Sequence, residues 1–380
     1  MASLEVGIVG LPNVGKTTLF NALTESGAAV TSFAAVQTSA NVGVAAVPDE
    51  RIALLAGAVK ARAQVPASVG FADVSGLQRG AGASDGLGGE YLGHLRATDA
   101  LAHVVRCFTD DSVAHVDGRV DPVADAETVD LELLLADQAL VERRRERVSR
   151  AARVGEKSAR DELVALERLV AHLDEGEPAS AFGDALPEGL DLLTRKPMIY
   201  VANVDEGGDA EAVAALTAYA ASRGAEVVPV AARFEAELAE LDDQEERGAF
   251  LRDLGLDEPG MPRLARACYR ALGLISFFTA GPMEARAWTV RDGATAVEAA
   301  GKIHSDIARG FIRAEVIGWK DLVECGSHEE AKKRGLLRVE GKEYIVLDGG
   351  GHVPGYREMQ RFCVDFITDY AASAAKGLKT

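Results

Sequence analysis

Nine residues near the amino end, Gly10 to Thr18, place the strongest constraint on how this chain folds. They fit the pattern G-x-x-x-x-G-K-[ST], which in proteins wraps a backbone loop around a chain of phosphates. The apolar run Val6–Val9 before them predicts a buried strand, and Thr18–Leu23 predicts a helix. Because strand, glycine loop and helix follow in this order, the sequence indicates a phosphate-binding loop.

Each residue type in this loop has a physical role in holding a nucleotide. Gly10 and Gly15 let the backbone approach the phosphates closely, and successive N–H groups at the helix N-terminus supply positive potential. Lys16 adds a catalytic charge at the outer phosphates, and the Thr17 hydroxyl is suited to bind Mg²⁺. We therefore expect the nucleotide to contact a run of six residues: Asn13, Val14, Gly15, Lys16, Thr17 and Thr18.

Length, charge and cysteine spacing limit the remaining possibilities. The 380 residues exceed one ordinary core, so two or three domains are expected. The N-terminus has no secretory pattern and no run is long and apolar enough to span a membrane, which predicts a soluble, cytoplasmic protein. A formal charge of −18 argues against indiscriminate nucleic-acid binding. The widely spaced Cys107, Cys268, Cys325 and Cys363 are expected to be reduced thiols, with one redox-sensitive thiol left as an alternative.

A second motif supports nucleotide hydrolysis. Val69–Asp73 predicts another buried strand, and Asp73 with Gly76 completes the pattern D-x-x-G at the start of a glycine-rich loop. A hydrolase of this type needs a carboxylate that holds Mg²⁺ and a glycine N–H that meets the terminal phosphate. We assign these roles to Asp73 and Gly76, and count Gly76 among the catalytic residues.

The pattern of strands predicts a doubly wound α/β fold. Further strands are expected over 41–47, 101–108, 197–203 and 225–231, with helices over 210–223 and 235–254. Strands that alternate with helices favour a parallel sheet, which binds ligands at the carboxyl ends of its strands.

Between these strands, the sequence predicts a pair of antiparallel helices. Apolar residues, with a few polar ones that a helix seam tolerates, recur at spacings of three and four from Leu131 to Ala152. The same spacing returns from Ala159 to Leu173, beyond a turn. The first helix is rich in arginine, with acidic residues intermixed. This face is either solvated or a contact for a phosphate backbone such as that of rRNA.

Asn203, Val204 and Glu206 are expected to bind the base. They occupy the position where a GTPase of this topology carries N-K-x-D, but Val204 replaces the Lys and Glu206 replaces the Asp. Guanine presents donors at N1 and N2 to that Asp, whereas adenine lacks the N2 amine. We therefore expect ATP to be preferred over GTP.

Several motifs resemble those of the YchF / Obg-like ATPase family, and the similarity extends to about residue 348. They are Gly10–Thr24, Val104–Phe108, Asn203–Glu206, Phe277–Pro282, Arg286–Thr289, His304–Asp306 and Arg309–Val316. The resemblance implies a translation-factor-class P-loop ATPase with an inserted helical hairpin and a C-terminal TGS domain of β-grasp type. It also implies association with the ribosome and a link to translation or stress responses.

The family also suggests which group orients the attacking water. Many GTPases carry a Gln just after D-x-x-G, but Leu77 stands there in this chain. The family's proposed substitute is a histidine in a loop, and its match is His115. A histidine of ordinary pKa can orient or deprotonate water at neutral pH. Hydrolysis is expected to be slow and stimulated by a partner.

Three features depart from the family pattern, one of which is Val36 in place of a Cys of some members, which weakens any carried-over redox regulation. Gln37 stands where the family has its Mg²⁺-binding Thr, so Thr38 could bind the metal only with a shift of one residue. The tail after Asp348 is unrelated, and the last β-grasp strand is either missing or replaced, with Arg361–Val364 as the candidate.

The sequence thus predicts five segments and leaves three functions open. The segments are a G domain over 1–126 and 191–275, an inserted coiled-coil hairpin over 127–190, a TGS-like domain over 276–365 and a tail over 366–380. The leading function is a slow ribosome-associated ATPase that binds ATP and Mg²⁺. The alternatives are an ATP-binding scaffold that hardly hydrolyses and an Obg-type GTPase.

Overall fold

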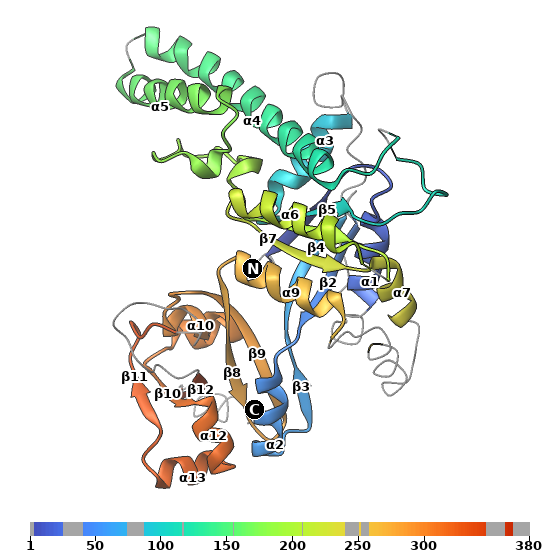
Figure 1. Ribbon diagram of the computed structural model, residues 1–380. Helices are drawn as coiled ribbons and strands as arrows, with labels where there is room; N and C mark the ends of the chain where they lie inside the picture. Colours follow the sequence, from blue (N-terminus) through green and yellow to red (C-terminus); the bar gives the residue numbers. More distant parts are fainter. Residues whose placement is uncertain are drawn as a thin grey trace, which may run out of the picture. The chain divides into compact units, whose positions relative to one another are not determined.

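The chain divides into two compact units, which are described separately below. The first comprises Met1–Ala45 and Val69–Cys268, and the second Ala46–Ser68 and Tyr269–Thr380. The computed structural model in Figure 1 describes residues 4–25, 41–73, 87–115, 118–154, 156–206, 208–239, 251, 258–346 and 362–367.

The first unit is built on a six-stranded sheet with the order β2-β4-β1-β5-β6-β7. Strand β1 pairs in parallel with β4 and β5, and β5–β6 and β6–β7 are also parallel. All seven residues of β5 are buried, as expected of a strand covered on both faces. The strands are β1 Glu5–Val9, β2 Asn41–Val47, β4 Ala67–Asp73, β5 Ala100–Arg106, β6 Met198–Asn203 and β7 Glu226–Val230.

Helices cover this sheet in the predicted alternation. Ala126, Tyr200 and Leu216 join α4, β6 and α6 in one buried apolar cluster, and α1 packs against α7. Helix α7 covers Ala232–Ala239 and so includes the start of the helix predicted over 235–254; residues 240–250 and 252–254 of that prediction lie outside the described residues. The helices of the unit are α1 Lys16–Glu25, α3 Leu87–Ala97, α4 Pro122–Arg153, α5 Lys157–Asp174, α6 Ala210–Ser222, α7 Ala232–Ala239 and α9 Gly260–Ala271.

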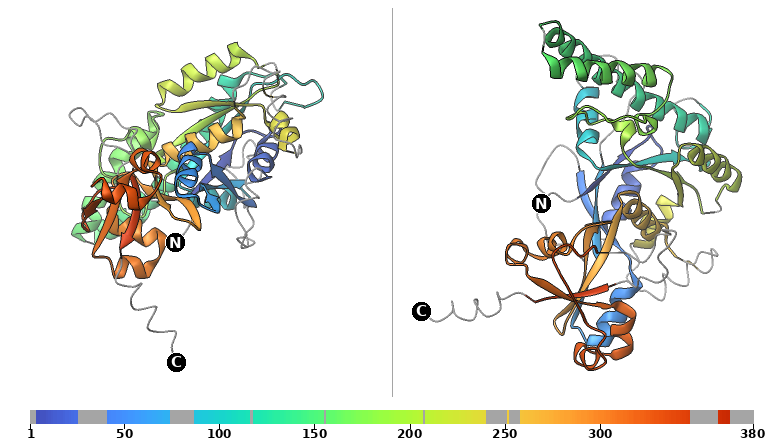
Figure 2. Two further views of the ribbon diagram at one scale, coloured as in Figure 1. Left: turned by 90° about the horizontal axis from the view of Figure 1, so that it is seen from below. Right: turned by 90° about the vertical axis from the view of Figure 1, so that its left-hand side faces the viewer.

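Helices α4 and α5 form the predicted antiparallel hairpin (Figures 1 and 2). Helix α4 begins at Pro122, before the predicted Leu131, because Asp121 caps the Ala124 N–H and a proline is favourable in the first turn. The seam between the helices is apolar, with Val141, Leu166 and Leu169 fully buried. Two 3₁₀ turns follow the hairpin: η1 Ala179–Ala181, within the linker predicted over 174–189, and η2 Leu193–Arg195, beyond it.

The second unit is a six-stranded mixed sheet with the order β11-β10-β12-β8-β9-β3. Strand β8 pairs antiparallel with β9, and β10 pairs antiparallel with β11 and β12. Its core includes Phe277, Phe311 and Val316. The strands are β3 Ala63–Val65, β8 Leu274–Ala280, β9 Glu284–Arg291, β10 Arg313–Gly318, β11 Arg338–Glu340 and β12 Phe362–Ile367; the helices are α2 Glu50–Val59, α10 Ala296–Ile303, α11 Ser305–Arg309, α12 Trp319–Cys325 and α13 His328–Lys333.

The tail supplies a strand to the middle of this sheet. Strand β12, Phe362–Ile367, overlaps the candidate segment Arg361–Val364 from Phe362 onward and lies between β10 and β8. Of the two outcomes that the divergent tail left open, replacement of the last strand is therefore the one the structure shows.

Residues 46–68 belong to the second unit, although the sequence placed them in a G domain over 1–126. Strand β3 pairs in parallel with β9, and the Arg62 N–H donates to the Pro282 carbonyl at 3.2 Å. The Arg51 guanidinium lies 4.6 Å from the centre of the Phe278 ring. The domain bounds read from the sequence stay a prediction.

Candidate nucleotide site

The loop between β1 and α1 has a backbone that only glycine accepts at two positions. Gly10 has φ +153° and Gly15 φ +96°, in a region that L side chains rarely adopt. A Cβ on Gly10 would lie 2.4 Å from the Val104 carbonyl oxygen, and one on Gly15 would lie 2.3 Å from Asn203 Nδ2. The loop therefore packs directly on β5 and on the end of β6.

Lys16 folds back over this loop. Its Nζ donates to the carbonyls of Gly10 at 2.9 Å and Leu11 at 2.7 Å, and the residue is 8% exposed. Burial lowers the pKa of Lys16 to about 8, and the charge of Asp73 opposes that shift. The ammonium is thus held beside a carboxylate, at the loop where a phosphate chain would add further negative charge.

Thr17 and Asp73 meet where a metal ion is expected. The Thr17 hydroxyl donates to Asp73 Oδ2 at 3.3 Å. Asp73 is 3% exposed, and its Oδ1 has no hydrogen-bond partner among the described residues. A buried carboxylate oxygen without a donor fits a cation, so these two residues suit Mg²⁺. No group of three His, Cys, Asp or Glu side chains gathers in the described ranges.

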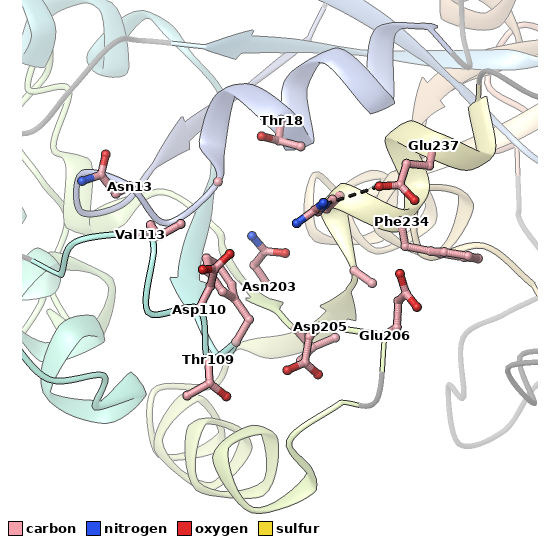
Figure 3. A pocket seen from close by; sticks show the side chains of 15 residues that line it. Asn13, Thr18, Thr109, Asp110, Val113, Asn203, Asp205, Glu206, Phe234 and Glu237 are labelled. Carbon is pink, nitrogen blue, oxygen red and sulfur yellow. Dashed lines mark hydrogen bonds and ion pairs between the residues drawn. The ribbon is translucent and has the colours of Figure 1, made fainter.

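A cavity of about 810 Å³ opens beside the loop (Figure 3). Of the predicted nucleotide contacts it is lined by Asn13, Gly15, Thr18, Asn203, Val204 and Glu206. Val14, Lys16 and Thr17 lie in the same loop without lining the cavity. Sequence reasoning missed several other lining residues: Phe108, Thr109, Asp110, Val113, Asp205, Ala231, Arg233, Phe234 and Glu237.

Asn203 joins the phosphate loop to the start of α7. Its Nδ2 donates to the Val14 carbonyl at 2.8 Å, and its Oδ1 accepts from the Ala232 N–H at 3.1 Å. Each end of the amide is thus engaged with backbone, and the residue is 5% exposed. Asn203 thus connects the phosphate loop to the start of α7, while Val204 and Glu206 line the cavity beside it.

His115 lies against the start of α4. Its Nε2 is 2.8 Å from Asp125 Oδ2, and both side chains are almost fully buried. The ring is not among the residues that line the cavity. The loop before it nevertheless reaches the phosphate loop, because Asn13 Nδ2 donates to the Ala114 carbonyl at 3.2 Å.

Four residues of the predicted switch segments lie outside the described part of the chain. They are Gln37, Thr38, Gly76 and Leu77.

Cys107, at the end of β5, is expected to be an inert thiol. It is 3% exposed, and burial followed by the charges of Asp209 and Asp125 raises its pKa to about 12. At pH 8 a thiol-directed reagent should label the partly exposed Cys325 first and Cys107 only after denaturation. Peptide mapping by mass spectrometry gives the order. Equal labelling rates for the two thiols in native protein would instead support redox sensitivity at Cys107.

Two family models match the chain. One is described as a 50S ribosome-binding GTPase and covers residues 5–142. The other is named YchF-GTPase_C, described as a protein of unknown function (DUF933), and covers residues 274–351. None of the described helices combines the length and hydropathy that a membrane span requires.

Full-length relatives show the same similarity. The "Ribosome-binding ATPase YchF" of Bacillus subtilis (strain 168) is 46% identical over 357 residues, which cover 91% of this chain and 97% of the relative. The protein of the same name from Escherichia coli O157:H7 is 45% identical over 350 residues, covering 90% and 96%.

A solved structure extends the similarity to the fold. The Schizosaccharomyces pombe YchF GTPase matches with a TM-score of 0.81 and 30% identity, covering 97% of this chain and 98% of the other. The predicted fold class, a P-loop α/β fold followed by a C-terminal domain, is therefore confirmed. With these identities over nine-tenths of its length, the chain belongs to the YchF family.

Proposed function

We propose that this protein is a ribosome-associated ATPase that hydrolyses ATP slowly and acts as a nucleotide-dependent switch in translation or the stress response. The observation that carries the proposal is the arrangement of Lys16, Thr17 and Asp73 around a glycine loop that admits no side chain at Gly10 or Gly15. The names of the relatives support both the ATPase activity and the ribosome as partner. Binding to ribosomes would place it in the cytoplasm.

In this proposal, catalysis comes mainly from groups that position the phosphates and stabilise their negative charge. Thr17 and Asp73 would hold Mg²⁺, with Thr38 as a further ligand, and such an ion would supply positive charge at the outer phosphates. Lys16 supplies a second positive charge, and the Gly76 N–H would meet the terminal phosphate. Each of these groups stabilises the spread of charge in phosphoryl transfer.

We expect slow hydrolysis because a leucine replaces the usual water-orienting Gln and the histidine that could take over this role is bound to another side chain. Leu77 cannot orient a nucleophile, and His115 is held by Asp125. We propose that His115 acts once its loop brings the ring to the phosphate, with Asp125 fixing its tautomer until then. An unassisted rate of roughly 10⁻⁴ s⁻¹ corresponds to a barrier of about 22 kcal/mol. A partner that supplies or orients charge can lower that barrier by several kcal/mol.

The side chains of Val204 and Glu206, which line the cavity where the base would bind, favour adenine over guanine. Val204 provides no cation to cover a base, and the longer Glu206 replaces the Asp that pairs with guanine N1 and N2. A site that has lost such a polar pair loses discrimination for guanine.

The hairpin would contribute a contact to rRNA. Arg143, Arg147, Arg150 and Arg153 are exposed on α4, whereas Arg144 and Arg145 are paired with Glu162 and Glu142. Exposed guanidinium groups on one helix suit a phosphate backbone, and such binding weakens as salt rises.

The test is turnover of ATP and GTP with and without 70S ribosomes or large subunits, together with competition of GTP against a fluorescent ATP analogue. We expect slow ATP turnover that ribosomes stimulate, and weak competition by GTP. Fast unassisted turnover or guanine-selective binding would contradict the proposal.

A second function, an ATP-holding scaffold, is favoured by one observation. His115 is turned to Asp125 rather than into the cavity. Single-turnover hydrolysis measured beside a binding titration separates the two functions, because a scaffold binds ATP without cleaving it.

A further inference from the structure

Arg106, the last residue of β5, is a buried cation that the nucleotide scheme above does not use. It is 3% exposed. Its Nε donates to the Phe108 carbonyl at 3.2 Å, its Nη1 to Val113 at 2.9 Å and its Nη2 to Asp110 at 3.0 Å. All three guanidinium nitrogens therefore bind the backbone of the loop that follows β5.

This loop forms one wall of the 810 Å³ cavity. Phe108, Thr109, Asp110 and Val113 all line it. Figure 3 shows Thr109, Asp110 and Val113 across from Phe234 and Glu237. The Arg106 guanidinium also lies 4.5 Å from the centre of the Phe108 ring, a distance typical of cation–π contact. The Arg106 side chain thus contacts this wall in two ways: by hydrogen bonds to its backbone and by its contact with the Phe108 ring.

The loop has little regular structure to hold this shape alone. Asp110 accepts from the Ser112 N–H at 2.9 Å, and the Val113 N–H donates to the Asp110 carbonyl at 3.1 Å, which closes one turn. Its far end meets the phosphate loop through Asn13 and the Ala114 carbonyl. Three carbonyls spread over six residues are brought together by one side chain, so removing that side chain would leave them without their common donor.

We propose that Arg106 is a positioning residue that sets nucleotide affinity by holding the cavity wall over residues 108–113. The inference rests on the proposed nucleotide site. Arginine is required because its planar fork carries five N–H donors in fixed directions, which reach three carbonyls at once. Lysine keeps the charge but concentrates its donors at one point.

The test compares Arg106→Lys and Arg106→Gln with the matched control Arg96→Lys. Arg96 is a partly buried arginine, with 17% of its side chain exposed, and its Nη2 also donates to a carbonyl, that of Ala136 at 3.1 Å; unlike the three residues whose carbonyls Arg106 binds, Ala136 does not line the cavity. The readouts are the Kd for ATP and ADP by titration, KM and kcat for ATP, and the melting temperature without nucleotide.

We expect Arg106→Lys to raise the Kd for both nucleotides and the KM for ATP by about tenfold, and Arg106→Gln to raise them further. The kcat at saturating ATP should change by less than about threefold, because Lys16, Thr17 and Asp73 are untouched and His115 has its own anchor at Asp125. Arg96→Lys should lower the melting temperature and leave KM unchanged. A rise in KM with little change in kcat indicates a positioning role. General destabilisation would instead reduce the fraction of active protein and hence the apparent kcat.

Three results would overturn the inference. They are a KM within twofold of the wild type for Arg106→Gln, a loss confined to kcat, or an equal rise in KM for Arg96→Lys. If Arg106→Gln does not fold, Arg106→Lys decides alone. Failure of the wild-type protein to bind ATP would instead reject the proposed function, so the two failures are distinguishable.

Discussion

Lys16→Ala should weaken ATP binding by about 10² or more and remove measurable hydrolysis. The ammonium is the charge closest to the expected position of the outer phosphates, and it is held there by two carbonyls of the same loop. Alanine removes that charge and leaves both carbonyls without their donor. Isothermal titration with ATP and single-turnover assays measure the two effects.

The matched control is Lys320→Ala, which removes an exposed lysine from α12 in the second unit. It should bind ATP as the wild type does. Unchanged ATP affinity in Lys16→Ala, with the protein folded by circular dichroism, would reject the phosphate-loop assignment itself.

Asp130→Asn should lower the free energy of unfolding by about 3 kcal/mol at pH 7. Asp130 is 8% exposed, and its Oδ2 accepts from the hydroxyls of Tyr200 at 2.6 Å and Tyr219 at 2.7 Å. Arg223 lies 3.4 Å from the same oxygen. Asparagine keeps the volume but removes the charge and turns one acceptor into a donor. Urea unfolding followed by circular dichroism gives the difference.

The size of this loss should depend on pH. Burial alone raises the pKa of Asp130, but its interactions with His103, Tyr200 and Tyr219 outweigh burial and hold the pKa below the usual 3.8. A depressed pKa in the folded state contributes stability above pH 3.8, and that contribution is lost as pH falls through the folded value. The difference between wild type and Asp130→Asn should therefore shrink at pH 3.

Glu127→Gln, an exposed position one turn earlier on α4, serves as the control. It should change stability by less than about 0.5 kcal/mol at either pH. If Asp130→Asn were as stable as this control, the buried cluster would not be what joins α4 to the sheet.

The elements predicted best are those fixed by local chemistry. The strand over 41–47 has the predicted bounds, because a short run of mostly apolar residues depends only on neighbours in sequence. The phosphate loop was predictable for the same reason, since its strand, glycines and Lys16 are consecutive. At the other end of the chain, an apolar run marked the strand that became β12.

Features that depend on distant partners were not predictable. The pairing of β3 with β9 joins residues more than two hundred positions apart, and nothing within 63–65 indicates it. The wall over 108–113 has no strand or helix period, so its place in the cavity comes from Arg106. The family motif Val104–Phe108 contains that arginine and could have drawn attention to it. The pairing of His115 with Asp125 likewise depends on how the loop returns to α4.

Because residues 46–68 belong to the second unit, neither unit of this protein can be expressed as one continuous fragment. A fragment starting at Tyr269 would lack β3, exposing the edge of β9 to other chains, and would leave Phe278 without the guanidinium of Arg51. Chimeras between relatives, or split reporters built on this scaffold, must therefore move this short internal segment together with the carboxyl-terminal part.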